Sequence, residues 1–317
     1  MGSQAESQRG RAAGLRVLAL TMGLTTALVT AGAATAGTAG AAAGDPGPAI
    51  GAVHAVGPAA QRAAGSFWTR ARMTTATPAG EQPGAVVPDG APPGTPSPTQ
   101  FSGVPTVGAL FFTSGTKQTH FCTASVVNSL TANLVLTAAH CVYGSSYASN
   151  IEFVPAYHDG QQPDGAWPVQ TITVANGWKK SHDPNLDFAF LAVTPPAGTS
   201  KQIQFVTGAL RLGINAGYDH HRIEVIGYNN TGDAPIKCAT TSFEFRTSQM
   251  KFFCRDYQDG TSGGPWILGY NDITGTGTVF GVIGGYKEGG LYPWASFSAY
   301  FGGPALKLFL QAEEQHI

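Results

Sequence analysis

Short hydrophobic runs, interrupted by glycine, proline or asparagine, make up the chain from about residue 101 onward. A first set comprises Val107–Phe112, Ala124–Val127, Leu134–Thr137, Ile151–Pro155, Val169–Val174 and Phe188–Val193. A second set comprises Ile223–Tyr228, Phe243–Phe245, Lys251–Phe253, Trp266–Leu268, Val279–Ile283 and Ala295–Phe297. Many short β-rich runs with frequent turn residues predict an all-β protein of barrels or sandwiches.

The break between the two sets lies near Pro195-Pro196-Ala197-Gly198, which places the units at about residues 104–196 and 200–300. Proline fits the first turn of a helix, so Pro304 and the run Ala305–Glu314 predict a C-terminal helix over about 304–315. Residues 101–317 are enough to enclose two hydrophobic cores.

The N-terminus has the pattern of a secretory signal peptide, which we assign to residues 1–36. Arg9, Arg11 and Arg16 precede a mostly apolar segment from Val17 to Val29, and small residues follow it. An apolar core of this length is too short to span a bilayer, although a retained signal anchor is the alternative. The pattern predicts a secreted protein that has no membrane attachment once the signal is cleaved, in a compartment where disulfides persist.

Residues 37–100 differ in composition from the rest of the chain. Ten of the 21 prolines lie between Gly44 and Gln100, together with much alanine and glycine. Such a segment buries little apolar surface, so we predict that it is disordered and serves as a propeptide or a linker.

Composition adds little positive evidence. The net charge is -1 and charged residues make up 12%, so no charge pattern favours nucleic acid as a partner. The pair His220-His221 follows Asp219, but adjacent histidines point in different directions and no third ligand is evident, so we predict no metal and no cofactor. The four cysteines suit two bridges.

Candidate chemistry centres on Asp259-Gly260-Thr261-Ser262-Gly263-Gly264-Pro265-Trp266. Glycines around a serine suit a tight turn that exposes the hydroxyl and can aim the N–H groups of Gly260 and Ser262 at one point, as an oxyanion hole does. The same letters fit the nucleophile elbow of α/β-hydrolases, in which acid and histidine follow the serine. Only His316 follows here, so the base must lie upstream.

Two upstream motifs complete a set. His140 lies in Leu136-Thr137-Ala138-Ala139-His140-Cys141 and Asp187 begins Asp187-Phe188-Ala189-Phe190. In this order the three motifs resemble the chymotrypsin/trypsin-like serine proteases, over roughly Val107 to the C-terminal helix. The resemblance implies two six-stranded antiparallel β-barrels, with Ser262 as nucleophile, His140 as base then acid, and Asp187 as the orienting group. The 75-residue interval from Asp187 to Ser262 resembles the compact bacterial secreted branch, which includes glutamyl-endopeptidase-like proteins.

The resemblance also implies further assignments. Cys122 matches the family's partner for Cys141, which leaves Cys238 and Cys254 to pair, although rival pairings stay open on the sequence alone. Gly284, Gly285 and Tyr286 resemble the strand that binds substrate backbone, with Gly284 where a serine often supports the aspartate. Counting back from Ser262 puts Asp256 at the base of the specificity pocket, with a surface loop position as the alternative. Ile283 occupies the place of the histidine used for glutamyl specificity.

The sequence therefore predicts a monomeric secreted serine endopeptidase that acts on protein or peptide substrates. Two alternatives are a catalytically silent binding protein on the same fold and, because the motif is shared, a serine esterase.

Overall fold

The first six predicted strands form a closed barrel in the computed structural model, which describes residues 50–79, 90–115, 118–229 and 233–315. These strands are β4 (Val107–Ser114), β5 (Gln118–Val126), β6 (Leu134–Thr137), β7 (Ser149–Pro155), β8 (Trp167–Ala175) and β9 (Ala189–Val193). The antiparallel order β4-β5-β6-β9-β8-β7 closes because β7 pairs with β4. Alternate side chains fill the interior, among them Leu110, Val135 and Ile172, which are fully buried.

The second six predicted strands form another antiparallel sheet. They are β11 (His220–Gly227), β12 (Ile236–Arg246), β13 (Gln249–Phe253), β14 (Pro265–Asn271), β15 (Thr276–Val282) and β16 (Ala295–Ala299). A short strand that the sequence pattern did not predict, β10 (Arg211–Leu212), joins in parallel with β15, giving the order β10-β15-β14-β11-β12-β13-β16.

The prediction of two closed six-stranded barrels is wrong for this second sheet. No ladder pairs β15 with β16 in the part of the chain that the structure describes. The Val282 N–H instead donates to the Ser298 side chain at 3.0 Å, and the Gly284 N–H donates to Phe297 O at 3.0 Å. A side-chain acceptor thus takes the place of a backbone acceptor, and the two strands meet without a regular ladder.

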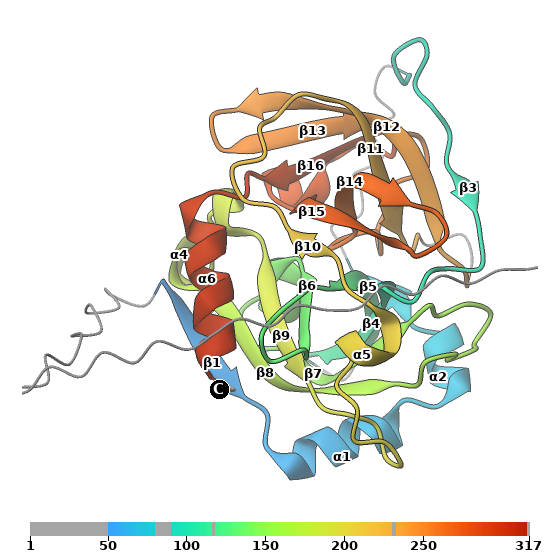
Figure 1. Ribbon diagram of the computed structural model, residues 1–317, viewed down its shortest axis with the longest axis vertical. Helices are drawn as coiled ribbons and strands as arrows, with labels where there is room; N and C mark the ends of the chain where they lie inside the picture. Colours follow the sequence, from blue (N-terminus) through green and yellow to red (C-terminus); the bar gives the residue numbers. More distant parts are fainter. Residues whose placement is uncertain (1–49, 80–89, 116–117, 230–232, 316–317) are drawn as a thin grey trace, which may run out of the picture. The chain divides into compact units, whose positions relative to one another are not determined.

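The prediction that residues 37–100 are disordered is wrong for most of the described part of this segment. Residues 50–79 contain β1 (Gly51–Ala55), α1 (Pro58–Phe67), α2 (Arg70–Thr74) and β2 (Thr77–Pro78), and β3 (Thr99–Gln100) pairs with β12. β1 extends the first sheet by pairing with β8 over five residues, and α1 lies across the lower side of the same barrel in Figure 1. The segment is ordered because its apolar side chains are buried against the first barrel. Trp68 and Met73 are buried in this contact.

The predicted C-terminal helix is present as α6 (Gly303–Glu314), which packs beside β1, β8 and β9 (Figure 1). Three short helices were not predicted: α3 (Ala139–Val142), α4 (Asn176–Ser181) and α5 (Gln204–Thr207). The 3₁₀ turns η1 (Pro184–Leu186) and η2 (Tyr286–Gly289) were not predicted either. The predicted signal peptide lies outside the described residues, and within them no helix is both long and apolar enough to cross a membrane.

Candidate active site

His140 and Asp187 form a buried pair at one end of the first barrel. His140 lies on α3, which begins shortly after the end of β6, and Asp187 directly follows η1 and lies just ahead of β9, which pairs with β6. His140 Nδ1 lies 2.9 Å from Asp187 Oδ2, and the backbone N–H of His140 donates to Oδ1 at 3.0 Å. Two neighbouring strand ends therefore hold both the ring and the backbone of the histidine against one carboxylate.

The Asp187 carboxylate, which is fully buried, receives a third hydrogen bond from the second sheet. The Gly285 N–H donates to Asp187 Oδ2 at 2.8 Å. A Cβ at Gly284 would lie only 3.0 Å from both Asp187 O and Oδ2, so glycine at this position lets the backbone approach closely. The hydrogen bond that a serine side chain at position 284 would donate to Asp187 is thus donated by the backbone N–H of Gly285.

The pKa of His140 is raised above its ordinary value by a balance of opposing effects. Burial of the imidazole, the largest single effect, lowers the pKa, but the charge and hydrogen bond of Asp187, with smaller contributions from the charges of Glu288 and Asp259, outweigh it. The site therefore raises the proton affinity of the imidazole, which favours proton transfer to His140 during a reaction.

Ser262 is held on a turn against the first barrel, close to the segment that leads to His140. Ser262 O accepts a hydrogen bond from the Thr123 N–H at 2.7 Å, and Thr123 O accepts one from the Thr137 hydroxyl at 2.8 Å. The next residue, Gly263, has φ +80, and a Cβ there would overlap Thr123 O and the Thr137 hydroxyl. Only glycine allows the serine turn to pack this closely beside residues 137–138.

The backbone of Gly260, one of the two predicted oxyanion donors, has φ +92. A Cβ at this position would overlap the Phe121 ring and lie 2.7 Å from Tyr228 O, so glycine is required here too. The Gly260 N–H donates at 3.2 Å to the carbonyl oxygen of Ala79, at the end of the N-terminal segment. The Gly260 N–H therefore donates to a carbonyl oxygen, which is the chemical group that an oxyanion hole binds.

A small hollow of about 40 Å³ lies beside Ser262. Its apolar wall includes Tyr257, Ile283 and Leu291, and its charged lining residues are Asp259, Lys287 and Glu288. Asp256 does not line it: this residue is exposed in a turn with φ +60. The structure therefore favours the surface-loop alternative for Asp256 over the base of a specificity pocket.

The predicted substrate strand also differs from expectation, because the N–H groups of Gly284, Gly285 and Tyr286 all have partners within the protein. The Tyr286 ring packs on Phe245 and Phe297, and none of the three residues lines the hollow beside Ser262. Strand β15 ends at Val282, and the chain turns at η2, where Lys287 and Glu288 have positive φ. These three residues therefore support Asp187 and pack within the second sheet.

Two contributors were not predicted from the sequence. Thr123, which connects the serine turn to β5, could have been found from its position next to Cys122. Glu288, which lines both the hollow beside Ser262 and a second hollow that contains His140, lies in a glycine-rich loop without any pattern that marks it.

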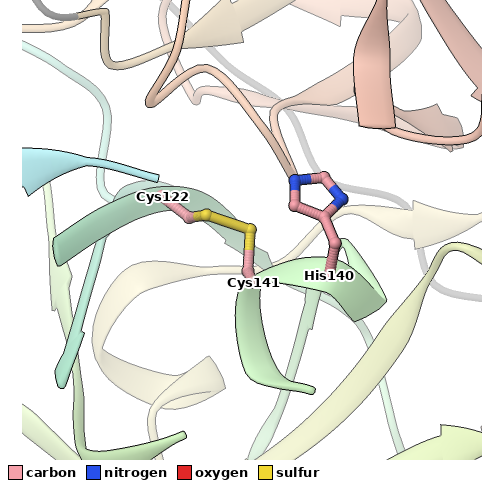
Figure 2. A group of neighbouring side chains, drawn as sticks. All are labelled: Cys122, His140 and Cys141. Atoms are coloured by element: carbon pink, nitrogen blue, oxygen red, sulfur yellow. A yellow bond between two sulfur atoms is a disulfide. The ribbon is translucent and has the colours of Figure 1, made fainter. Parts of the chain in front are cut away.

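The two disulfides are Cys122–Cys141 and Cys238–Cys254. Within the described part of the chain, the cluster that comes nearest to a metal site is Cys122, His140 and Cys141 (Figure 2). The two sulfurs are bonded to each other, so neither offers the thiolate that binds a metal. The bridge instead fixes the residue after His140 to β5.

Comparison with known proteins gives a family and several similar folds. The family model described as Trypsin matches residues 94–293. A thermostable serine protease, AL20, from an extremophilic microorganism is 27% identical, with a TM-score of 0.59, and the match covers 66% of this chain and 97% of that one. Protease Anisep from Arthrobacter nicotinovorans is 24% identical, with a TM-score of 0.60 and coverage of 68% and 99%. A Glu endopeptidase is 18% identical, with a TM-score of 0.56 and coverage of 70% and 99%; at these two identities the likeness concerns the fold. No curated protein matches.

Proposed function

Because the chain belongs to the trypsin family, we propose that it is an exported serine endopeptidase that uses Ser262, His140 and Asp187. The observation that carries this proposal is the pair of hydrogen bonds from His140 to a fully buried Asp187 carboxylate. With Nδ1 bonded to Asp187, the imidazole has its other nitrogen, Nε2, in the tautomer that accepts a proton. The signal-peptide pattern at residues 1–36 supports export.

The proposed reaction divides peptide hydrolysis into two acyl transfers. The Ser262 hydroxyl attacks the peptide carbonyl carbon as its proton passes to His140 Nε2, and Asp187 stabilises the imidazolium that forms. His140 then gives this proton to the leaving amine, which breaks the C–N bond and leaves an acyl-enzyme. Water attacks the ester in the same way, releasing the carboxylic acid and restoring the serine.

The negative charge that develops on the carbonyl oxygen needs hydrogen-bond donors fixed before the reaction. We assign this role to the N–H groups of Gly260 and Ser262, on the turn that Gly263 packs against β5. The contact of Gly260 with a carbonyl oxygen of the chain itself supports this assignment.

The lining of the hollow beside Ser262 does not favour one charge on the substrate. It holds two acids, Asp259 and Glu288, and one base, Lys287. With Asp256 on the surface and Ile283 in the wall, the features that would select basic or glutamyl residues are both missing from their expected places. We therefore propose endopeptidase activity without assigning a preferred residue before the cut.

An active-site serine probe and a substrate panel test the proposal. A fluorophosphonate should label the wild type and fail to label Ser262→Ala, with Ser296→Ala, another lining serine, as the matched control. Peptide libraries read by mass spectrometry should show cuts that Ser262→Ala abolishes. Turnover of short esters without any peptide cleavage would favour an esterase, and neither labelling nor cleavage in any form of the protein would favour a silent binding protein.

A further inference from the structure

Residues 50–79, here called the strap, run from the far side of the first barrel to the candidate active site. The strap begins as β1, which pairs with β8, continues through α1 and α2, and ends with β2, which pairs in parallel with β5. It therefore follows the outside of the barrel that carries His140 and Asp187 (Figure 1).

Aromatic packing and specific hydrogen bonds hold the middle of the strap. Trp68 is 5% exposed and packs on Phe111, and its Nε1–H donates to Asn150 O at 2.5 Å. Arg70 Nη2 donates to Asp159 O at 2.9 Å. A buried tryptophan whose N–H is hydrogen-bonded is among the side chains that contribute most to the free energy of docking.

The end of the strap reaches the atoms proposed for catalysis. The Ala79 N–H donates to Phe121 O at 2.9 Å, and Ala79 O accepts the Gly260 N–H at 3.2 Å. One residue thus bridges β5 of the first sheet and the serine turn of the second. Pro78 and Ala79 also line the hollow that contains His140.

The second nitrogen of His140 is also buried. Nε2, the atom that would take the serine proton, is buried and has no hydrogen-bond partner among the residues that the structure describes. This nitrogen therefore belongs to an imidazole that Asp187 orients for catalysis, but the atom itself is buried.

We infer that the strap is an inhibitor carried on the same chain, which blocks the site by placing the Ala79 carbonyl on an oxyanion donor. This inference rests on the proposed function. A substrate carbonyl must take the Gly260 N–H for itself, so it competes with Ala79, and the apparent reactivity falls by the fraction of molecules in which the strap is docked. Undocking of the strap activates the enzyme, with no rebuilding of the His140–Asp187 pair.

Two substitutions within the full chain weaken the docking of the strap and lie outside β4–β9 and β10–β16. Ala79→Pro removes the N–H that bonds Phe121 O, and Ala79→Ser, which keeps that N–H, is its matched control. Trp68→Ala removes the main anchor, and Arg62→Ala, at an exposed position on α1, is its control. The two readouts are the rate of Ser262 labelling by a fluorophosphonate and the exchange rate of the Gly260 amide hydrogen, followed by NMR.

We expect Ala79→Pro to raise both rates about tenfold, as the loss of one hydrogen bond implies, and Trp68→Ala to raise them further. The two controls should behave as the wild type. Equal amide exchange in Ala79→Pro and Ala79→Ser would overturn the inference. Faster exchange of the Gly260 amide without faster labelling of Ser262 would overturn the inhibitory role. If Ser262 were labelled in no variant, the proposed protease function would fail as well. The exchange data would still report whether the strap is docked.

Discussion

Asp187 determines how strongly His140 binds a proton. We expect Asp187→Asn to lower kcat about 10⁴-fold, as the same change does in a well-studied triad, because the neutral amide neither fixes the productive tautomer nor stabilises the imidazolium. The pKa of His140 should fall, since burial, which lowers it, would lose its main opposition. The measurement is the pH profile of kcat/KM on a peptide substrate, in a form of the protein with the strap undocked.

The direction of the pH effect follows from the role of the base. A base must be neutral to accept the serine proton, so wild-type activity should be lost as the pH falls through a His140 pKa that lies above its ordinary value. In Asp187→Asn this acid limb should move to lower pH. Asp272→Asn, which removes only an exposed ion pair with Lys237, should leave the limb in place. An acid limb that did not move in Asp187→Asn would contradict the assignment of His140 as the base.

Gly263 tests whether close packing of the serine turn requires glycine. Gly263→Ala should lower the free energy of unfolding by more than about 3 kcal/mol, because a positive φ is combined with overlap on Thr123 O and the Thr137 hydroxyl. Gly269→Ala is the control: its φ is +58, but a Cβ there meets nothing within 4 Å, so about 1 kcal/mol is expected. Urea unfolding measures both, and equal losses would show that backbone conformation alone matters.

The residues proposed for catalysis could be identified from the sequence because each lies in a short local motif. Their chemistry needs a hydroxyl on a glycine turn, an imidazole and a carboxylate, and local sequence carries all three. Asp256 could not be placed, because counting back from Ser262 fixes a position in the chain but not the left-handed turn found there. Pocket lining depends on such loop conformations, which no periodic pattern reveals.

At the scale of elements, the strands whose own side chains form the hydrophobic cores were predicted from the sequence. The elements whose order depends on packing against those strands were not. Leu134–Thr137 was predicted with the bounds of β6, since its four residues are all buried. The strap was not predicted, because between Gly51 and Pro78 its large apolar residues are few and its order comes from the surface it covers. Its one aromatic cluster, Phe67-Trp68, is the part that anchors it.

The packing of α1 on β7 should make stability depend on pH through Glu152. This β7 side chain is 2% exposed, Oε2 has no hydrogen-bond partner among the described residues, and a Cβ at Gly65 of α1 would lie 3.6 Å from Oε1. Burial raises the pKa of Glu152 to about 7. The native state therefore keeps a proton that the unfolded chain releases, and the free energy of unfolding should fall between about pH 4.5 and pH 7, by at most about 3 kcal/mol.

Thermal unfolding across this pH range compares the wild type with Glu152→Gln. The glutamine has no proton to lose, so this part of the pH dependence should disappear and the variant should be the more stable above pH 7. Glu314→Gln, on the exposed end of α6, should keep the wild-type slope. If the two variants gave the same slope, the pH dependence would have to arise from other groups.

At the scale of the whole molecule, Thr123 on β5 is one of the residues that join the two sheets at the proposed site. Its hydroxyl donates to Gly260 O at 3.0 Å and accepts the Tyr228 N–H at 2.8 Å, and all of these contacts are buried. Thr123→Val keeps the shape of the side chain but leaves both backbone groups without their partner. We expect a loss of about 2 kcal/mol in the free energy of unfolding and a fall of at least about tenfold in kcat/KM, because the Gly260 peptide would no longer be fixed from β5.

The matched control is Thr207→Val on α5, where the hydroxyl of another buried threonine lies within hydrogen-bond distance of two carbonyl oxygens, Ile203 O at 3.0 Å and Gly208 O at 2.8 Å. This change should cost a similar free energy of unfolding and leave kcat/KM unaltered in the strap-undocked protein, since both acceptors lie away from the serine turn. A general loosening of the fold would lower the activity of both variants alike. Activity lost only in Thr123→Val would show that the contact between the two sheets itself positions the oxyanion donor, and equal activity in both would remove Thr123 from the site.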